Sequence, residues 1–133
     1  MKDRKMRNTK MAITERDLGR KQSDVVTEME KKFPVMTAEF KRIQQAQYEL
    51  FCAKQSNYGP DNISMGSSLE RQDDRKLSLQ GLFFRINDKV NRYKQMIMFG
   101  SQDAVGESLD DTFKDISVYG IIAQLVQSGK WGK

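Results

Sequence analysis

The sequence predicts an all-α fold, a bundle of the four-helix type that homo-oligomerisation completes. Two observations carry this prediction. Apolar residues recur at steps of three and four along several segments, which is typical of helices with one buried face. Strand signals are weak, since no Asn-Gly or Asp-Gly hairpin turn is present and no segment alternates apolar and polar residues. With 133 residues, the chain fits one compact helical domain.

The first two helices are predicted at about residues 23–33 and 37–54. Ser23 or Asp24 is a suitable N-cap for the first, and Pro34 ends it. Thr37 is a suitable N-cap for the second. The second helix carries one apolar stripe, formed by Phe40, Ile43, Ala46, Leu50 and Ala53.

Two further helices are predicted at about residues 78–98 and 107–127. A loop with several helix-breaking residues, 56–62, and a polar stretch, 64–76, precede the first of them. Its narrow apolar face is formed by Leu79, Leu82, Phe83, Ile86, Val90, Tyr93 and Ile97. The last helix is apolar nearly all round in its second half, so we expect it to be central in a bundle or an interface.

The positive charge is concentrated at the N-terminus. Residues 1–21 hold eight Lys or Arg and three Asp or Glu, which equals the whole net charge of +5. We therefore divide the chain into a basic, partly disordered N-terminal arm, 1–22, and a helical domain, 23–133. The arm is either a solvated tail or a contact for nucleic acid or a host protein, and it has no aromatic residue for base stacking.

Histidine is absent, which excludes catalytic centres and zinc sites that need an imidazole. Hydrolytic chemistry would then use carboxylates with a hard cation, Mg²⁺ or, as a substitute, Mn²⁺. Cys52 is the single cysteine, which fits a reducing compartment such as the cytoplasm. No run of residues is long and apolar enough for a membrane span, and the N-terminus has no apolar signal region.

Three acids near the start of the last helix are the candidate metal ligands. Glu107, Asp111 and Asp115 follow each other at steps of four and continue into an apolar stripe. Carboxylates gathered away from water repel one another by roughly 3 kcal/mol per pair at about 6 Å, so they need a cation. Mg²⁺ would supply the charge. Two alternatives are open: a favourable interaction with the helix dipole, and pairing with Lys or Arg of the same chain.

Cations on the preceding helix are candidates for binding phosphate. Arg85, Lys89 and Arg92 follow one another at steps of four and three, with Asp88 among them. A solvated face with weak local ion pairs is an equally good interpretation of this segment.

The second helix and the loop after it supply the remaining candidates. Lys54 could bind phosphate, and Asn57 and Tyr58 could contact a base and its ribose. Glu49 is the candidate catalytic residue, as a further metal ligand or as the base that orients a water molecule.

Three strings of the sequence carry a resemblance to a known family: KQSNYGPDNI, LQGLFFRINDKVNRYKQM and GESLDDTFKDISVYGIIA. Over about residues 37–127 they resemble the nucleotide-modification-associated domain of phages and bacteria. That domain is similar to the all-alpha MazG-like nucleoside triphosphate pyrophosphohydrolases. The resemblance implies a helical homodimer or homotetramer that cleaves a nucleotide between its alpha and beta phosphates with Mg²⁺.

The resemblance places metal ligands at Glu107, Asp111 and Asp115, with Glu49 as a further ligand. It matches Arg85, Asp88, Lys89 and Arg92 to the charged motif of the third helix. Two positions depart from the pattern: Glu49 lacks a partner acid three residues away, and Asn57 stands where the related domain often has Asp. The predicted function is a Mg²⁺-dependent hydrolase that converts dNTP to dNMP and pyrophosphate. A nucleotide-binding or protein-interaction module without catalysis is the alternative.

Overall fold

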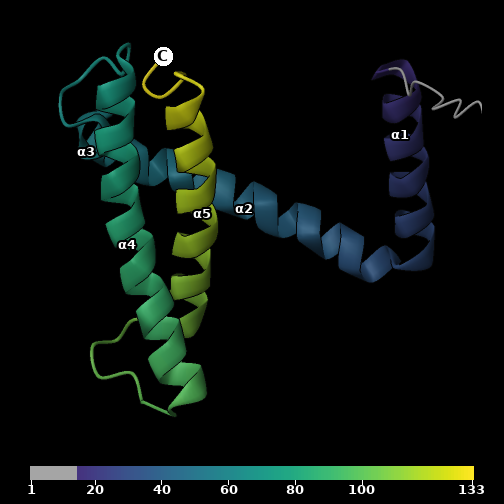
Figure 1. Cartoon of the computed structure of the whole chain (residues 1–133). Helices are drawn as coiled ribbons and strands as arrows, with labels where there is room; N and C mark the ends of the chain where they lie inside the picture. The colour runs from purple at the N-terminus through teal and green to yellow at the C-terminus, as the bar shows by residue number, and fades with distance from the viewer. Residues whose placement is uncertain (1–14) are drawn as a thin grey trace, which may run out of the picture. The chain divides into compact units, whose positions relative to one another are not determined.

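The computed structural model describes residues 15–133, and it describes the side chains from residue 19 onward except that of residue 20. Residues 1–14 of the predicted arm lie outside the described residues. Residues 15–22 belong to the first helix, which therefore begins before the predicted N-cap at Ser23 or Asp24. All regular elements in the described part of the chain are helical, which confirms the all-α class (Figure 1). The helices are α1 (Glu15–Lys32), α2 (Pro34–Tyr58), α3 (Asp61–Ser64), α4 (Gln72–Met98) and α5 (Leu109–Gln127). None of these helices is long and apolar enough to cross a membrane.

The internal contacts divide the chain between Gln44 and Gln45, inside α2. In the first unit, α1 ends at Lys32 and Pro34 is the first residue of α2. Proline has no N–H to donate, so it ends a preceding helix but is favourable in the first turn of the next one. Thr37, the predicted N-cap, lies inside α2, and its hydroxyl donates to the carbonyl of Phe33 at 2.9 Å. An exposed ion pair between Glu30 and Lys41 joins the two helices of this unit at 2.9 Å.

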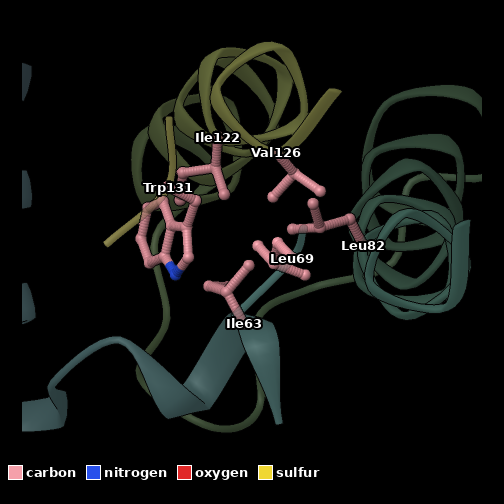
Figure 2. Close-up of a cluster of buried hydrophobic side chains, with 6 residues drawn as sticks. All are labelled: Ile63, Leu69, Leu82, Ile122, Val126 and Trp131. Carbon is pink, nitrogen blue, oxygen red and sulfur yellow. The ribbon is translucent and has the colours of Figure 1, made fainter. Parts of the chain in front are cut away.

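The second unit is built on the packing of α4 against α5, with α3 against α4. Six apolar side chains form its core, and Figure 2 shows them pointing toward one another. They come from α3, the α3–α4 loop, α4, α5 and the C-terminal tail: Ile63, Leu69, Leu82, Ile122, Val126 and Trp131. The Trp131 indole N–H donates to the carbonyl of Pro60 at 3.0 Å, and its ring meets that of Phe51 edge-on at 6.1 Å.

Leu69 is a core residue that the predicted apolar stripes do not include, since it lies with Met65 in the polar stretch 64–76. Its backbone has φ +61°, a left-handed conformation that costs a leucine roughly 1–2 kcal/mol. Only 1% of Leu69 is exposed, and burial of a leucine side chain returns about 1.5–3 kcal/mol. The Ser67 hydroxyl oxygen also accepts from the Leu69 N–H at 3.0 Å, which holds the turn.

Many apolar side chains of the predicted stripes are exposed. On α2 no residue is buried, and Phe40 and Ile43 keep 65% and 43% of their surface. On α4, Leu82 is buried but Phe83 is 61% exposed. The bundle and its completion by a second copy therefore remain predictions, because the described helices do not cover these faces.

Candidate functional site

A cleft of about 440 Å³ opens in the second unit, within the size range of small-molecule sites. Four helices line it. From α2 come Gln47, Leu50, Phe51, Lys54, Gln55 and Tyr58; from α3 and α4 come Asn62, Ile63 and Arg85; from α5 come Lys114, Asp115, Val118, Tyr119 and Ile122. The lining combines an apolar floor with cations, amides and aromatic rings.

The charged residues of the cleft favour an anion. Lys54, Arg85 and Lys114 carry three positive charges, and Asp115 carries the one negative charge, so the lining has a net charge of +2. Arg85 is oriented by a hydrogen bond from its Nη2 to the carbonyl oxygen of Asn62, at 2.7 Å. Lys114 pairs with Asp110 at 2.9 Å, and this hydrogen bond raises the lysine pKa.

Amides and rings lie beside these charges. Gln55 donates from its side-chain nitrogen to the Oδ1 of Asn62 at 2.9 Å, and also to the carbonyl of Gly59. Gln47 accepts from the Ser117 hydroxyl at 2.9 Å, which ties α2 to α5. Tyr58, at the C-terminal end of α2, is 66% exposed, so its ring can still be covered by a ligand.

Six charged side chains form what we call the ion-pair chain, which starts in the cleft lining with its first two members and continues beyond it: Lys54, Asp115, Lys89, Glu107, Arg92 and Asp103. Positive and negative groups alternate along it, so its net charge is zero. The N···O distances between successive members, in that order, are 3.7, 2.9, 2.6, 3.9 and 3.1 Å.

Lys89 is at the centre of the ion-pair chain. Its ammonium contacts Glu107 and Asp115 together, and its side chain keeps 22% of its surface. The hydrogen bond to Glu107 is the main cause of a raised Lys89 pKa, burial opposes it, and the bond to Asp115 adds to the increase. The geometry therefore keeps Lys89 charged.

Arg92 anchors the other end of the ion-pair chain. Its Nε donates to the hydroxyl of Thr112, which is fully buried, at 3.1 Å, and its Nη2 donates to the backbone carbonyl of Glu107 and to Asp103. A backbone N–H from Val105 is the main cause of a lowered Asp103 pKa, and Arg92 adds to it. The loop before α5 is thus fastened to α4.

Asp111 is bound by the helix N-terminus and is not a member of the ion-pair chain. Helix α5 begins at Leu109 with Ser108 as N-cap, and Asp111 completes a capping box in which its carboxylate accepts from the Ser108 N–H at 3.3 Å. Hydrogen bonds with Ser108 lower the Asp111 pKa. Glu107 lies in the loop before α5, so the helical spacing of four residues does not determine its position relative to Asp111 and Asp115. The loop nevertheless brings its carboxylate to 2.6 Å from the Lys89 ammonium.

Two other predicted residues lie outside the cleft. Glu49 is exposed on α2, where its carboxylate accepts from the side chain of Gln45 at 3.4 Å. Asn57 is exposed at the end of α2 and is not part of the lining. The structure thus brings together Lys54, Tyr58, Arg85 and Asp115 from the predicted set, with Lys89, Glu107 and Arg92 in the adjoining ion-pair chain.

The described side chains do not fit a divalent ion as they are arranged. Mg²⁺ needs oxygen ligands at about 2.0–2.1 Å, and Lys89 holds the position between Glu107 and Asp115 where the ion would bind. Asp111 is engaged by its capping box. Among the side chains that the structure describes, no three acidic or cysteine residues form a group that could hold a metal.

Several cleft residues were missed by the sequence reasoning, namely Gln47, Gln55, Asn62, Lys114 and Tyr119. A partial signal was present, because Gln47, Lys54 and Tyr58 recur at helical steps on one face of α2. Asn62 has no such signal, since the sequence predicts a loop over residues 56–62 where the structure has the short helix α3.

Comparisons with known protein families, with curated proteins and with solved structures found no match to the chain.

Proposed function

We propose that the cleft binds a nucleotide and that the protein acts as a nucleotide-binding module. The observation that carries this proposal is the net charge of +2 on a cleft that also offers an exposed tyrosine ring and three side-chain amides. A nucleotide combines an anionic phosphate with a flat, hydrogen-bonding base, so it matches both parts of the lining.

The phosphate would bind against Lys54 and Arg85. Lys54 is 55% exposed and lies 3.7 Å from Asp115, a distance beyond a hydrogen bond, so its ammonium is available to an anion. Arg85 has one N–H engaged by Asn62, and its remaining donors can bind phosphate oxygens with the directed geometry of a guanidinium. Lys114 adds a third charge at the edge of the cleft.

The base would stack on Tyr58 and contact the amides of Gln55 and Asn62. Stacking of a base on an aromatic ring contributes about 1–3 kcal/mol, which is sufficient to distinguish a nucleotide from inorganic phosphate. Phe51, Val118 and Ile122 form the apolar floor below.

Hydrolysis of the nucleotide remains a prediction from the sequence motifs. It needs Mg²⁺ on Glu107, Asp111 and Asp115, and the ion-pair chain and the capping box favour the non-catalytic alternative. The resemblance to pyrophosphohydrolases supports the ligand class in either case. The single cysteine and the resemblance to a phage and bacterial family support a role in a bacterial cytoplasm.

A homodimer or homotetramer is part of this proposal. Exposed apolar side chains on α4, among them Phe83, Phe84 and Ile97, are 56% to 64% accessible and would be covered by a second copy. Sedimentation equilibrium measures this directly, and a monomer at all concentrations contradicts it.

The test of the proposed function is calorimetric titration with dNMPs and dNTPs, with and without Mg²⁺, followed by chromatography of the products. We expect binding without products, and a Lys54→Gln or Arg85→Gln variant that binds about tenfold more weakly, since each loses one charged phosphate contact. Lys76→Gln is the matched control, because Lys76 lies on α4 outside the cleft. Folded protein that binds no nucleotide contradicts the proposal, and release of pyrophosphate would replace it with the hydrolase.

A further inference from the structure

Lys89 holds the position that a divalent ion would need. Its ammonium nitrogen lies 2.6 Å from Glu107 Oε1 and 2.9 Å from Asp115 Oδ2, which are short, charge-assisted hydrogen bonds. An ion that bound the same two oxygens would have to expel Lys89 and would then stand beside its positive charge.

The acids of the ion-pair chain also need no further charge. Lys89 and Arg92 alone contact all three carboxylates, Asp103, Glu107 and Asp115, and Lys54 lies farther away at 3.7 Å from Asp115. The usual reason for a metal among carboxylates is their uncompensated repulsion, and here these two cations already offset most of it.

We infer that Lys89 is the built-in cation of this site, so that the cleft takes its ligand without a divalent ion and prefers a nucleotide with a single phosphate. This inference rests on the proposed nucleotide site for its ligand. Lys89 is then a specificity-determining residue that acts through Glu107 and Asp115.

Charge matching leads to the monophosphate. A phosphate monoester carries about −1.5 to −2 at pH 7, which the +2 of the cleft lining balances. A triphosphate carries more negative charge, and proteins usually share it with Mg²⁺ held by one or two carboxylates. Lys89 withholds those carboxylates, so the triphosphate lacks this compensation in the cleft.

The first experiment needs no nucleotide. Mn²⁺ alone is titrated into the wild-type protein and into Lys89→Met, and free Mn²⁺ is followed by its electron paramagnetic resonance signal. We expect Lys89→Met to bind Mn²⁺ about tenfold or more tightly than wild type, because its two carboxylates have lost their shared partner. Lys76→Met, on the same helix, should behave as wild type. Adding Glu107→Gln to Lys89→Met should abolish the new binding.

Lys89→Gln keeps a hydrogen-bond donor and serves if Lys89→Met does not fold, which circular dichroism establishes. Equal Mn²⁺ affinity of wild type and both Lys89 variants overturns the inference. So does a wild-type Mn²⁺ site that Asp115→Asn removes, since the ion would then bind despite Lys89.

The second experiment compares dNMP and dNTP in calorimetric titrations with EDTA and with Mg²⁺. For the wild type we expect the same dNMP affinity in EDTA and in Mg²⁺. We also expect dNMP to bind about tenfold more tightly than dNTP, the difference that about 1.4 kcal/mol from the uncompensated charge of dNTP would give. Lys89→Gln should raise the affinity for dNTP in the Mg²⁺ buffer but not in the EDTA buffer. Wild-type binding that requires Mg²⁺ overturns the inference and leaves the nucleotide site in place. Failure to bind any nucleotide removes the proposed function and this ligand preference together, but not the Mn²⁺ result.

Discussion

The two ends of the α4–α5 pair are held by different kinds of side chain. At the end where α3 and the C-terminal tail lie, six apolar residues are in contact (Figures 1 and 2). Toward the end where a loop joins the two helices, the contacts are ion pairs, Lys89 with Glu107 and Arg92 with Asp103. Arg92 also donates to the hydroxyl of the buried Thr112. The apolar end has several segments to exclude water, whereas the charged end has a single loop.

This difference separates two tasks. Burial at the apolar end is non-directional and supplies most of the stability. Hydrogen bonds to charged groups at the other end depend on geometry, so they fix where the loop and Glu107 lie. Substitutions at the apolar end should therefore change stability most, and those at the charged end should also change what the cleft binds.

The largest effect is expected from Trp131→Ala. Loss of this buried ring should lower the free energy of unfolding by about 3–5 kcal/mol, the range for a core aromatic replaced by alanine. Urea denaturation followed by circular dichroism measures it. Trp131→Phe keeps a ring against Phe51 but loses the bond to Pro60, so its loss should be smaller. A loss below about 1 kcal/mol for the alanine variant would show that the tail is not part of the core.

Thr112→Val tests the charged end. Valine preserves the shape of threonine but removes the oxygen that accepts from Arg92, and a donor left unsatisfied costs about 1–3 kcal/mol. Thr112→Ser keeps the hydroxyl and is the matched control. If the two variants are equally stable in urea, the hydroxyl contributes nothing and the guanidinium is held by its other partners alone.

Ser108→Ala should have a smaller effect, typically about 1 kcal/mol for a lost N-cap. It removes the oxygen that accepts from the Asp111 N–H at 3.1 Å. Ser101→Ala, in the same loop but outside the cap, is the control for urea denaturation. Hydrogen exchange should show faster opening of the first turn of α5 only, and protection equal to wild type there would contradict the capping box.

The smallest effect is a pH dependence. Because the folded pKa of Lys89 is raised, its stabilisation is complete below the ordinary lysine value of about 10.4 and is lost as pH rises through the higher folded value. The urea midpoint of wild type should therefore fall more steeply above about pH 10.4 than that of Lys89→Gln. Lys76→Gln should follow wild type, and parallel curves for wild type and Lys89→Gln would show that the ion-pair chain does not stabilise the ammonium.

Helical periodicity predicted the long elements but not their ends. The last two helices were expected at 78–98 and 107–127, and they run over Gln72–Met98 and Leu109–Gln127. The extra turn at the start of α4 carries Asp73 and Asp74, which favour a helix N-terminus but resemble a polar loop in sequence. Leu69 was not predicted as a core residue because Met65 is the only other apolar side chain in residues 64–76, and two such residues do not make a sustained period.

The sequence predicted several residues of the candidate site, but it predicted less well which side chains they contact. Lys54, Tyr58 and Arg85 meet in the cleft as side chains suited to a nucleotide, which is the role that the sequence predicts for them. Asp115 also lines the cleft, but it contacts Lys89 and Lys54 and not the metal predicted for it. The role of Asp111 had a competing local signal, since Ser108 three residues earlier forms the pattern of a capping box. The pairing of Lys89 with Glu107 and Asp115 joins residues 18 and 26 positions apart, and no local pattern specifies it.

The single tryptophan gives the molecule an optical reporter of its own. Trp131 meets Phe51 edge-on, and Phe51 also lines the cleft, so this one ring separates the indole from whatever enters. A ligand that shifts Phe51 should alter the emission of Trp131 without any attached dye. The same fluorescence that follows unfolding can therefore be used to screen unlabelled compounds for entry into the cleft.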